Sequence, residues 1–159
     1  MSLDDEKKRA LYQTAFHRTV NHSGWGNRLT GNCLPACQLI LDDVKSHCKD
    51  AHIVIGQIYA GSKPETASKE ISRIQAFAAG KGPCQTPSFH AWIDIGDDDF
   101  LDIVGASWLA DQGFIKFNSI DFLDAARARE NGAEYVSAIQ DPTSVGAFYN
   151  LITASKGNK

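Results

Sequence analysis

Hydrophobic residues recur at helical spacing in the first third of the chain. Residues 4–22 predict an amphipathic helix, which ends before the break Gly24-Trp25-Gly26. Asn32 can cap a second helix, in which Pro35 is tolerated because it lies in the first turn. The buried face of this second helix is predicted from one apolar stripe: Cys37, Ile40, Leu41, Val44 and Cys48.

Three further helices are predicted in the rest of the chain. One carries Ile71, Ile74 and Ala78 and ends at Gly80. Another begins with Ser119 as its cap and runs to the stop signal Asn131-Gly132. The last is opened by Asp141-Pro142, as cap and first-turn proline, and has an apolar face made of Val145, Phe148, Tyr149 and Ile152.

Several segments have the residue types of β-strands. Residues 53–59 are β-branched and nearly all apolar, which predicts a strand covered on both faces. Residues 88–95 and 100–104 flank the turn-rich Gly96-Asp97-Asp98-Asp99 and predict a hairpin. Short strands are also expected at 114–117 and 135–139. Because no repeat or composition break is visible, we expect a single α+β domain over residues 1–159.

Composition narrows the classes of partner and compartment. Lys and Arg number 16 against 19 Asp and Glu, and no basic run could follow a phosphate backbone, so no nucleic acid is expected. No apolar stretch is long enough to cross a bilayer, and the acidic start lacks the features of a secretory signal. We therefore expect a cytoplasmic protein, with export by a signal-independent route left open. The four cysteines are expected to be reduced thiols, and no cofactor is expected.

Cys33 is the candidate nucleophile. It follows Thr30-Gly31-Asn32 and opens the second predicted helix. The N-terminus of a helix offers unpaired N–H groups and the positive end of the dipole, both of which favour a thiolate over a thiol. Alternatively, Cys33 is only a small buried residue with no catalytic role. Its position alone does not distinguish a nucleophile from such a residue.

His90 and Asp102 are the candidate base and the group that orients it. In the strand 88–95, alternation places His90, Trp92 and Asp94 on the face opposite Ala91 and Ile93. A lone histidine there is usually structural, unless a carboxylate reaches its second ring nitrogen. A three-residue loop of 96–98 would pair Ile95 with Asp99, set Asp102 opposite Trp92 and bring the carboxylate diagonally beside His90. A four-residue loop would set Asp102 opposite Ile93 and turn the carboxylate to the other face, unless a bulge restored the alternation.

These residues resemble the transglutaminase-like branch of the papain-like thiol enzymes. The matching pieces are Gly31-Asn32-Cys33 at the start of a helix, His90-Ala91-Trp92 in a strand, and Leu101-Asp102 in the next strand. The resemblance spans roughly residues 24–105 and is greatest for small bacterial members such as leader peptidases and glutamine deamidases. It implies N-terminal helices packed on an antiparallel sheet, with residues 1–22 as a first helix, 24–105 as the catalytic core and 106–159 as peripheral strands and helices.

The resemblance also implies an activity: acyl transfer through a thioester, with a peptide or protein as substrate. Cys33, His90 and Asp102 would form the catalytic triad. Asn27 lies six residues before Cys33, where papain-like enzymes often carry a glutamine that helps to bind the oxyanion. A turn-forming asparagine after Gly26 is the alternative for that residue.

Two other functions remain open at this point. The chain could be an inactive binding module that has kept the fold of a thiol enzyme. Cys33 and Cys37 could also share a metal ion with Cys48, Cys84 or a histidine. No second pair of closely spaced ligands supports that arrangement, so no metal site is predicted.

Overall fold

The structure is a computed structural model, and it describes residues 3–20, 33–81, 85–114 and 122–157. In these ranges the chain forms six helices and one antiparallel sheet of four strands, which confirms the α+β class. The helices are α1 (Asp5–Val20), α2 (Cys33–Lys45), α3 (Ala67–Ala78), α4 (Gly105–Asp111), α5 (Ala125–Glu130) and α6 (Pro142–Gly157). The strands are β1 (His52–Ala60), β2 (His90–Gly96), β3 (Asp99–Leu101) and β4 (Ala133–Ile139).

The sheet has the strand order β3-β2-β1-β4, which makes β1 a central strand. β1 is buried over most of its length, as its continuous apolar sequence predicted. Gly56 in this strand pairs with His90 of β2. A Cβ atom at position 56 would collide with the carbonyl oxygen of Val136 in β4. A glycine is therefore required in the strand beside His90.

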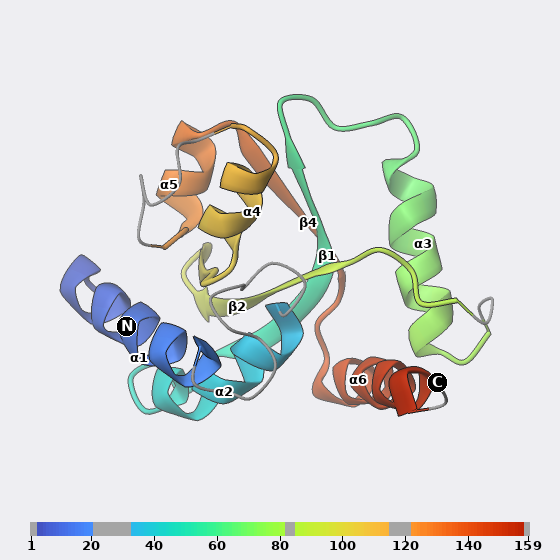
Figure 1. The fold of residues 1–159 in the computed structure, drawn as a ribbon, viewed down its shortest axis with the longest axis horizontal. Coiled ribbons are helices and arrows are strands. Elements are labelled where there is room, and N and C mark those ends of the chain that lie inside the picture. The colour runs from blue at the N-terminus through green and yellow to red at the C-terminus, as the bar shows by residue number, and fades with distance from the viewer. Residues whose placement is uncertain (1–2, 21–32, 82–84, 115–121, 158–159) are drawn as a thin grey trace.

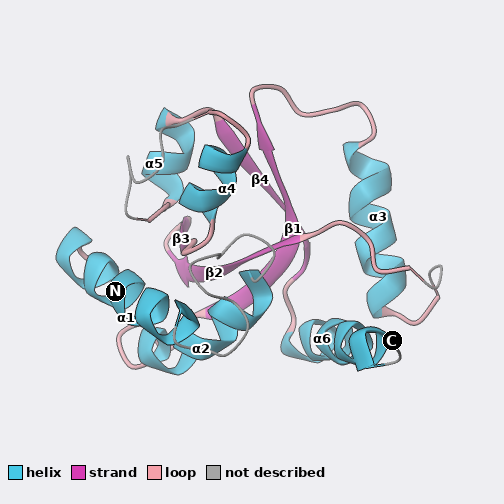
Figure 2. Ribbon diagram, viewed as in Figure 1, coloured by secondary structure: helices cyan, strands magenta, loops and turns pink. Residues whose placement is uncertain are grey.

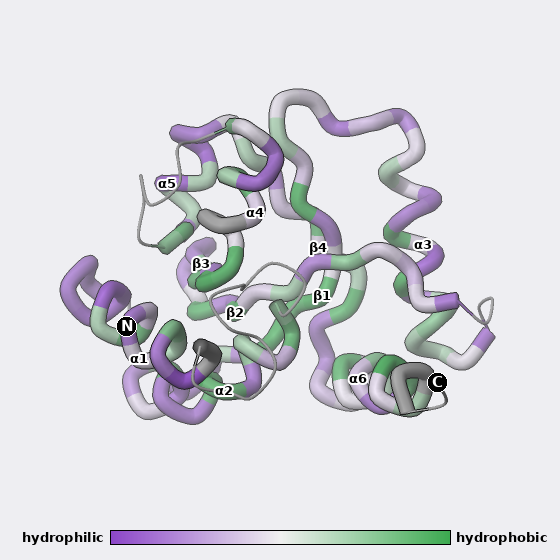
Figure 3. Tube along the Cα trace, viewed as in Figure 1, coloured by the Kyte–Doolittle hydropathy of each residue, from purple (hydrophilic) through white to green (hydrophobic). Residues whose placement is uncertain are grey.

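Helices cover the sheet in separate groups (Figure 1). α2 packs on β1 and β2, and α1 packs on α2. α3 and α6 contact each other and β1, while α5 contacts β3 and β4 (Figure 2). Hydrophobic residues gather along the central strands, and α1 carries a long hydrophilic stretch (Figure 3). The main core joins α2 to the sheet and α6 through residues that include Leu34, Ile40, Val44, Ile55, Ile93 and Phe148.

The turn of the β2–β3 hairpin is tighter than predicted. Gly96 pairs with Asp99, so the turn has two residues, Asp97 and Asp98, with φ of 54° and 58°. The predicted three-residue loop was therefore wrong. A register shift between Asp94 and Gly96 absorbs the difference. Beyond this shift the pairs are those of the predicted register: Asp94 with Phe100 and Ile93 with Leu101.

The segment between β3 and β4 differs most from the prediction. α4 was not predicted, and the helix expected from Ser119 begins only at Ala125, where the side chain of Asp124 caps it by accepting a hydrogen bond from the backbone N–H of Arg127. Ser119 lies outside the described residues. Of the strand expected at 114–117, Phe114 is not in a strand and 115–117 lie outside the described residues.

Candidate active site

Cys33 is the first residue of α2, as the sequence predicted. Its side chain is buried, with a relative exposure of 5%. The apolar stripe of α2 packs on β1 and β2 and so fixes where the helix begins relative to the sheet. Asn32, its expected cap, and Asn27, the expected oxyanion donor, lie outside the described residues.

His90 is the first residue of β2, and its ring is fixed from two sides. The indole of Trp92 stacks on the imidazole with ring centroids 6.1 Å apart and an interplanar angle of 26°. The ring of Tyr135 from β4 meets the imidazole edge-on at 6.0 Å. His90 is buried, and its Nε2 donates a hydrogen bond of 2.6 Å to Oδ2 of Asp102. This is the contact that the hairpin register predicted.

Asp102 directly follows β3 and is fully buried. Its backbone pairs with that of Leu123 in an isolated β-bridge, which holds it after the strand has ended. Its carboxylate accepts four hydrogen bonds: two on Oδ1 from the backbone N–H groups of Val104 and Gly105, and two on Oδ2 from His90 and the Tyr135 hydroxyl. Both oxygens of this buried carboxylate therefore have hydrogen-bond partners within the protein.

The charge state of His90 follows from its neighbours. Burial by itself lowers the pKa of His90, but the charge and hydrogen bond of Asp102, followed by the hydrogen bond and charge of Cys33, raise it to about 10. The imidazole is therefore protonated at neutral pH and lies between a sulfur and a carboxylate. The structure brings Cys33, His90 and Asp102 together, although they come from three separate segments of the chain.

Sequence reasoning missed Tyr135 and Gly105 as parts of this site. Tyr135 lies in β4, opposite Ile58 of β1, and its hydroxyl reaches across to Asp102. A Cβ atom on Gly105 would lie 2.5 Å from Oδ2 of Asp102 and 2.6 Å from the Tyr135 hydroxyl. A strand was predicted at 135–139. A single sequence does not indicate, however, which residue of that strand will contact the segment that follows β3.

The other described cysteines have a different environment from Cys33. Cys37 lies one turn further along α2 and is buried. Burial, followed by the charges of Asp102 and Cys33, raises the pKa of the Cys37 thiol well above its usual value. Cys48 is also buried, and Cys84 lies outside the described residues. Among the described residues, no group of His, Cys, Asp and Glu side chains is arranged to hold a metal ion.

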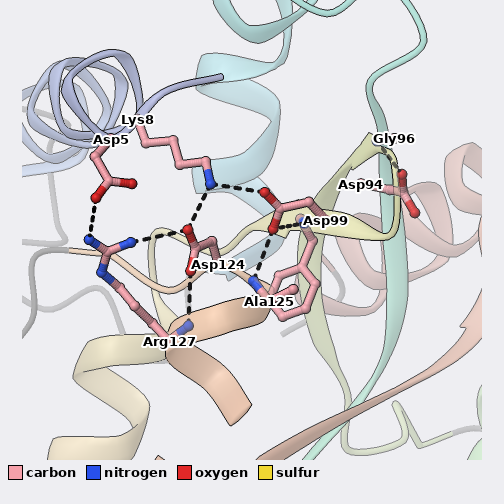
Figure 4. Close-up of polar contacts among 9 residues, drawn as sticks. Asp5, Lys8, Asp94, Gly96, Asp99, Asp124, Ala125 and Arg127 are labelled. Atoms are coloured by element: carbon pink, nitrogen blue, oxygen red, sulfur yellow. Dashed lines mark hydrogen bonds and ion pairs between the residues drawn. The ribbon is translucent and has the colours of Figure 1, made fainter. Parts of the chain in front are cut away.

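A second cluster of charges, buried at Lys8 and Asp124, joins α1 to the hairpin and α5 (Figure 4). Nζ of Lys8 lies 2.9 Å from Oδ2 of Asp99 and 2.7 Å from Oδ2 of Asp124. Arg127 bridges Asp124 and Asp5, at 3.0 Å from each. We call Lys8, Asp99, Asp124, Arg127 and Asp5 the Lys8 cluster. Because Asp124 follows Leu123, the cluster fixes the segment that pairs with Asp102.

Comparisons with protein-family models, with curated proteins and with solved structures find no match to this chain. Within the described ranges, no helix has the length and apolar character needed to span a membrane.

Proposed function

We propose that this chain is a cysteine-dependent acyl-transfer enzyme that acts on a peptide bond or a glutamine-type amide through a thioester. The observation that carries the proposal is the position of His90, which interacts with Cys33 on one side and donates a 2.6 Å hydrogen bond to Asp102 on the other. A protonated imidazole next to a cysteine at a helix N-terminus stabilises the thiolate, which is the nucleophilic form of the side chain.

We also propose that the fold is papain-like, in its transglutaminase-like form. Three features support this assignment: a cysteine opens a helix that packs on an antiparallel sheet, a histidine begins a strand that this helix covers, and an acid follows the neighbouring strand. The order Cys, His, Asp along the chain agrees with the resemblance in sequence. Function on this fold still has to be argued from the site itself.

In the proposed reaction, the Cys33 thiolate attacks the carbonyl carbon of the amide, and the carbonyl π electrons move to oxygen. The backbone N–H of Cys33 stabilises this oxyanion, with the side chain of Asn27 as a second donor. The C–N bond then breaks while His90 gives its proton to the leaving nitrogen, and a thioester remains. Asp102 keeps the imidazole oriented through both proton transfers.

The second half of the cycle regenerates the enzyme. Neutral His90 takes a proton from water, and the resulting hydroxide attacks the thioester carbon. The Cys33 thiolate leaves, and the carboxylic acid product is released. If an amine attacks in place of water, the same steps give a new amide. We propose hydrolysis or deamidation as the main reaction and transamidation as the second.

Alkylation by iodoacetamide tests the proposal without knowledge of the substrate. Iodoacetamide is a small reagent, which helps it to reach the buried thiol of Cys33. At about pH 6, peptide mapping by mass spectrometry should find Cys33 modified at least roughly 100-fold faster than Cys37 or Cys48, because an ordinary thiol is almost entirely protonated there. Cys37→Ala is the matched control, since it removes a neighbouring thiol from the same helix and should leave the rate at Cys33 within a few-fold.

Equal and slow modification of the described cysteines would reject the proposal and favour an inactive binding module. If Cys33 is reactive, a second test uses protein that has not been alkylated. A Cys33-directed amide probe should then form a thioester with the wild-type chain and none with Cys33→Ala. Both chains should unfold at the same urea concentration, which would show that the variant keeps its fold.

A further inference from the structure

The carboxylate oxygen that holds His90 has a second donor. Oδ2 of Asp102 accepts a 2.6 Å hydrogen bond from Nε2 of His90 and a 2.5 Å hydrogen bond from the hydroxyl of Tyr135. The two donors come from different strands, β2 and β4, which are not neighbours in the sheet. Since the other oxygen is occupied by two backbone N–H groups, Tyr135 is the one side chain besides His90 that these hydrogen bonds bring to Asp102 in the described structure.

We propose that Tyr135 is a positioning residue, which acts through Asp102 and limits how strongly this carboxylate holds the proton of His90. The inference rests on the proposed function, because it concerns the proton transfers of the same site. A carboxylate that shares its charge between two donors binds each of them less strongly than it would bind one alone. Tyr135 and His90 therefore compete for the same oxygen.

The hydroxyl of Tyr135 can act only as a donor in this contact. A carboxylate has no proton to give when it is ionised, so the phenol must supply it. Burial, followed by the charge and hydrogen bond of Asp102 and the charge of Cys37, raises the pKa of Tyr135 well above its usual value. The phenol thus keeps its proton over the whole range in which the site would work.

The aromatic ring fixes the hydroxyl in place. It packs on Phe100 with centroids 4.3 Å apart and on Trp92 with centroids 5.0 Å apart, nearly at a right angle. Trp92 also stacks on His90, so the imidazole and the phenol are held by the same indole. The hydroxyl is therefore set at Oδ2 before any substrate binds, which is how a positioning group should be built.

The competition matters in both halves of the proposed cycle. His90 must release its proton to the leaving nitrogen and later take one from water. If Asp102 held the imidazolium too strongly, the first step would lose driving force and neutral His90 would be scarce for the second. The titratable groups that face this carboxylate and imidazole are Cys33 and Cys37 from α2 and Tyr135 from β4. Of these, Tyr135 contacts the carboxylate directly.

Tyr135→Phe tests the inference, because it removes the hydroxyl and keeps the ring. The ring nitrogens of His90 are followed by NMR as a function of pH in a Cys33→Ala chain, where loss of the sulfur brings the pKa of His90 down into an accessible range. Tyr135→Phe should raise the pKa of His90 in this chain by about one pH unit. In the chain that keeps Cys33, the rate of alkylation by iodoacetamide is measured as a function of pH. The change in this rate at high pH, where His90 loses its proton, should also move to higher pH.

Tyr59→Phe is the matched control. The hydroxyl of Tyr59 donates a 3.0 Å hydrogen bond to Glu70, so the same kind of contact is removed at a distance from the site. This control should leave the titration of His90 unchanged. Tyr135→Phe in an Asp102→Asn chain should also leave it unchanged, because the route through the carboxylate is absent.

A second variant covers the case in which Tyr135→Phe does not fold. Site-specific replacement of Tyr135 by 3-fluorotyrosine keeps the shape and makes the phenol a stronger donor, so the pKa of His90 should fall. A folded Tyr135 variant that leaves the titration of His90 unmoved overturns the inference. A shift in His90 combined with an unreactive Cys33 would uphold the role of Tyr135 and reject the proposed function.

Discussion

Two clusters of charge in the described part of the chain are each built around a buried cation. In one, the cation Lys8 lies between the carboxylates of Asp99 and Asp124. In the other, the cation His90 lies between the carboxylate of Asp102 and the thiol of Cys33. Lys8 and His90 are equally buried, each with a relative exposure of 4%. In both clusters, hydrogen bonds from the protein replace those that water would give.

The difference lies in what the cation can do. Burial by itself lowers the pKa of Lys8, but its hydrogen bonds to Asp124 and Asp99 raise it above the usual value, so Lys8 is charged at all physiological pH values. His90 starts from a pKa of 6.5 and faces a thiol, so its proton can be shared with a nucleophile. Under the proposed function, buried charge alone does not make an active site. The site needs a titratable cation beside a reactive atom.

The largest expected effect comes from His90→Gln, because it removes the titratable cation and keeps an amide that can donate to Asp102. The rate of Cys33 alkylation at about pH 6 should fall roughly 100-fold, since the positive charge that favours a thiolate is gone. The rate is compared on folded protein, because the free energy of unfolding of this variant should also fall at a pH where His90 is charged. A fully reactive Cys33 in this variant would mean that His90 has no part in its activation.

Lys8→Met should mainly lower the stability of the protein and leave the reactivity of Cys33 nearly unchanged. Without Lys8, the buried carboxylate of Asp124 and the partly buried carboxylate of Asp99 lose a shared partner, and the free energy of unfolding should fall by about 3–5 kcal/mol in urea denaturation. The alkylation rate of the molecules that remain folded should change only a few-fold. Lys63→Met is the control, because Lys63 pairs with Glu134 at the surface and should cost at most about 1 kcal/mol.

The pH dependence of stability should also separate the two clusters. The folded pKa of His90 is raised from 6.5 to about 10, so its contribution is complete below pH 6.5 and is lost as the pH rises toward 10. For Asp124, burial raises the pKa, but hydrogen bonds from Lys8 and the Arg127 backbone lower it overall, so its contribution is lost only in acid, below its usual value of 3.8.

Urea denaturation at a series of pH values measures this difference. The free-energy gap between wild type and His90→Gln should be largest at pH 6.5 and shrink as the pH rises to about 10. For Lys8→Met the gap should stay constant over the same range. A gap for His90→Gln that grows with pH would show that the sign of the His90 shift is wrong.

The smallest effect concerns the packing that supports Asp102. Gly105→Ala places a methyl group against Asp102, Leu123 and Tyr135, so it should lower the free energy of unfolding by about 1–3 kcal/mol and also slow the alkylation of Cys33. Gly146→Ala in α6 is the control, because nothing lies within 4 Å of its Cβ position. That change should stabilise the helix by up to about 1 kcal/mol. Equal effects of the two alanines would contradict the close contact at Gly105.

The sequence predicted those parts of the site that depend on local patterns. The start of α2 at Cys33 follows from helix-start signals and one apolar stripe, and the contact of His90 with Asp102 follows from the alternation of β2 and the hairpin register. The turn was predicted wrongly and the register was still correct, because the irregularity at Ile95 compensates. Alternation is a strong constraint when one face of a strand must be buried.

The parts that were missed depend on contacts between distant segments. Lys8 pairs with residues 91 and 116 positions away, and Tyr135 reaches Asp102 across 33 positions. A lysine in an amphipathic helix predicts a solvated side chain, and nothing in the helical pattern separates Lys8 from Lys7. The later start of α5 has the same origin, because Leu123 is held in a bridge to Asp102. Tertiary pairing overrides local helix signals there.

The most direct test of the central claim is the pH titration of the ultraviolet absorbance of thiolate, taken as wild type minus Cys33→Ala. We predict one thiolate already present at about pH 6, well below the range of an ordinary thiol. In a His90→Gln chain, the same difference should be absent at about pH 6. The absence of this signal from the wild-type chain at about pH 6 would contradict a thiolate–imidazolium pair between Cys33 and His90.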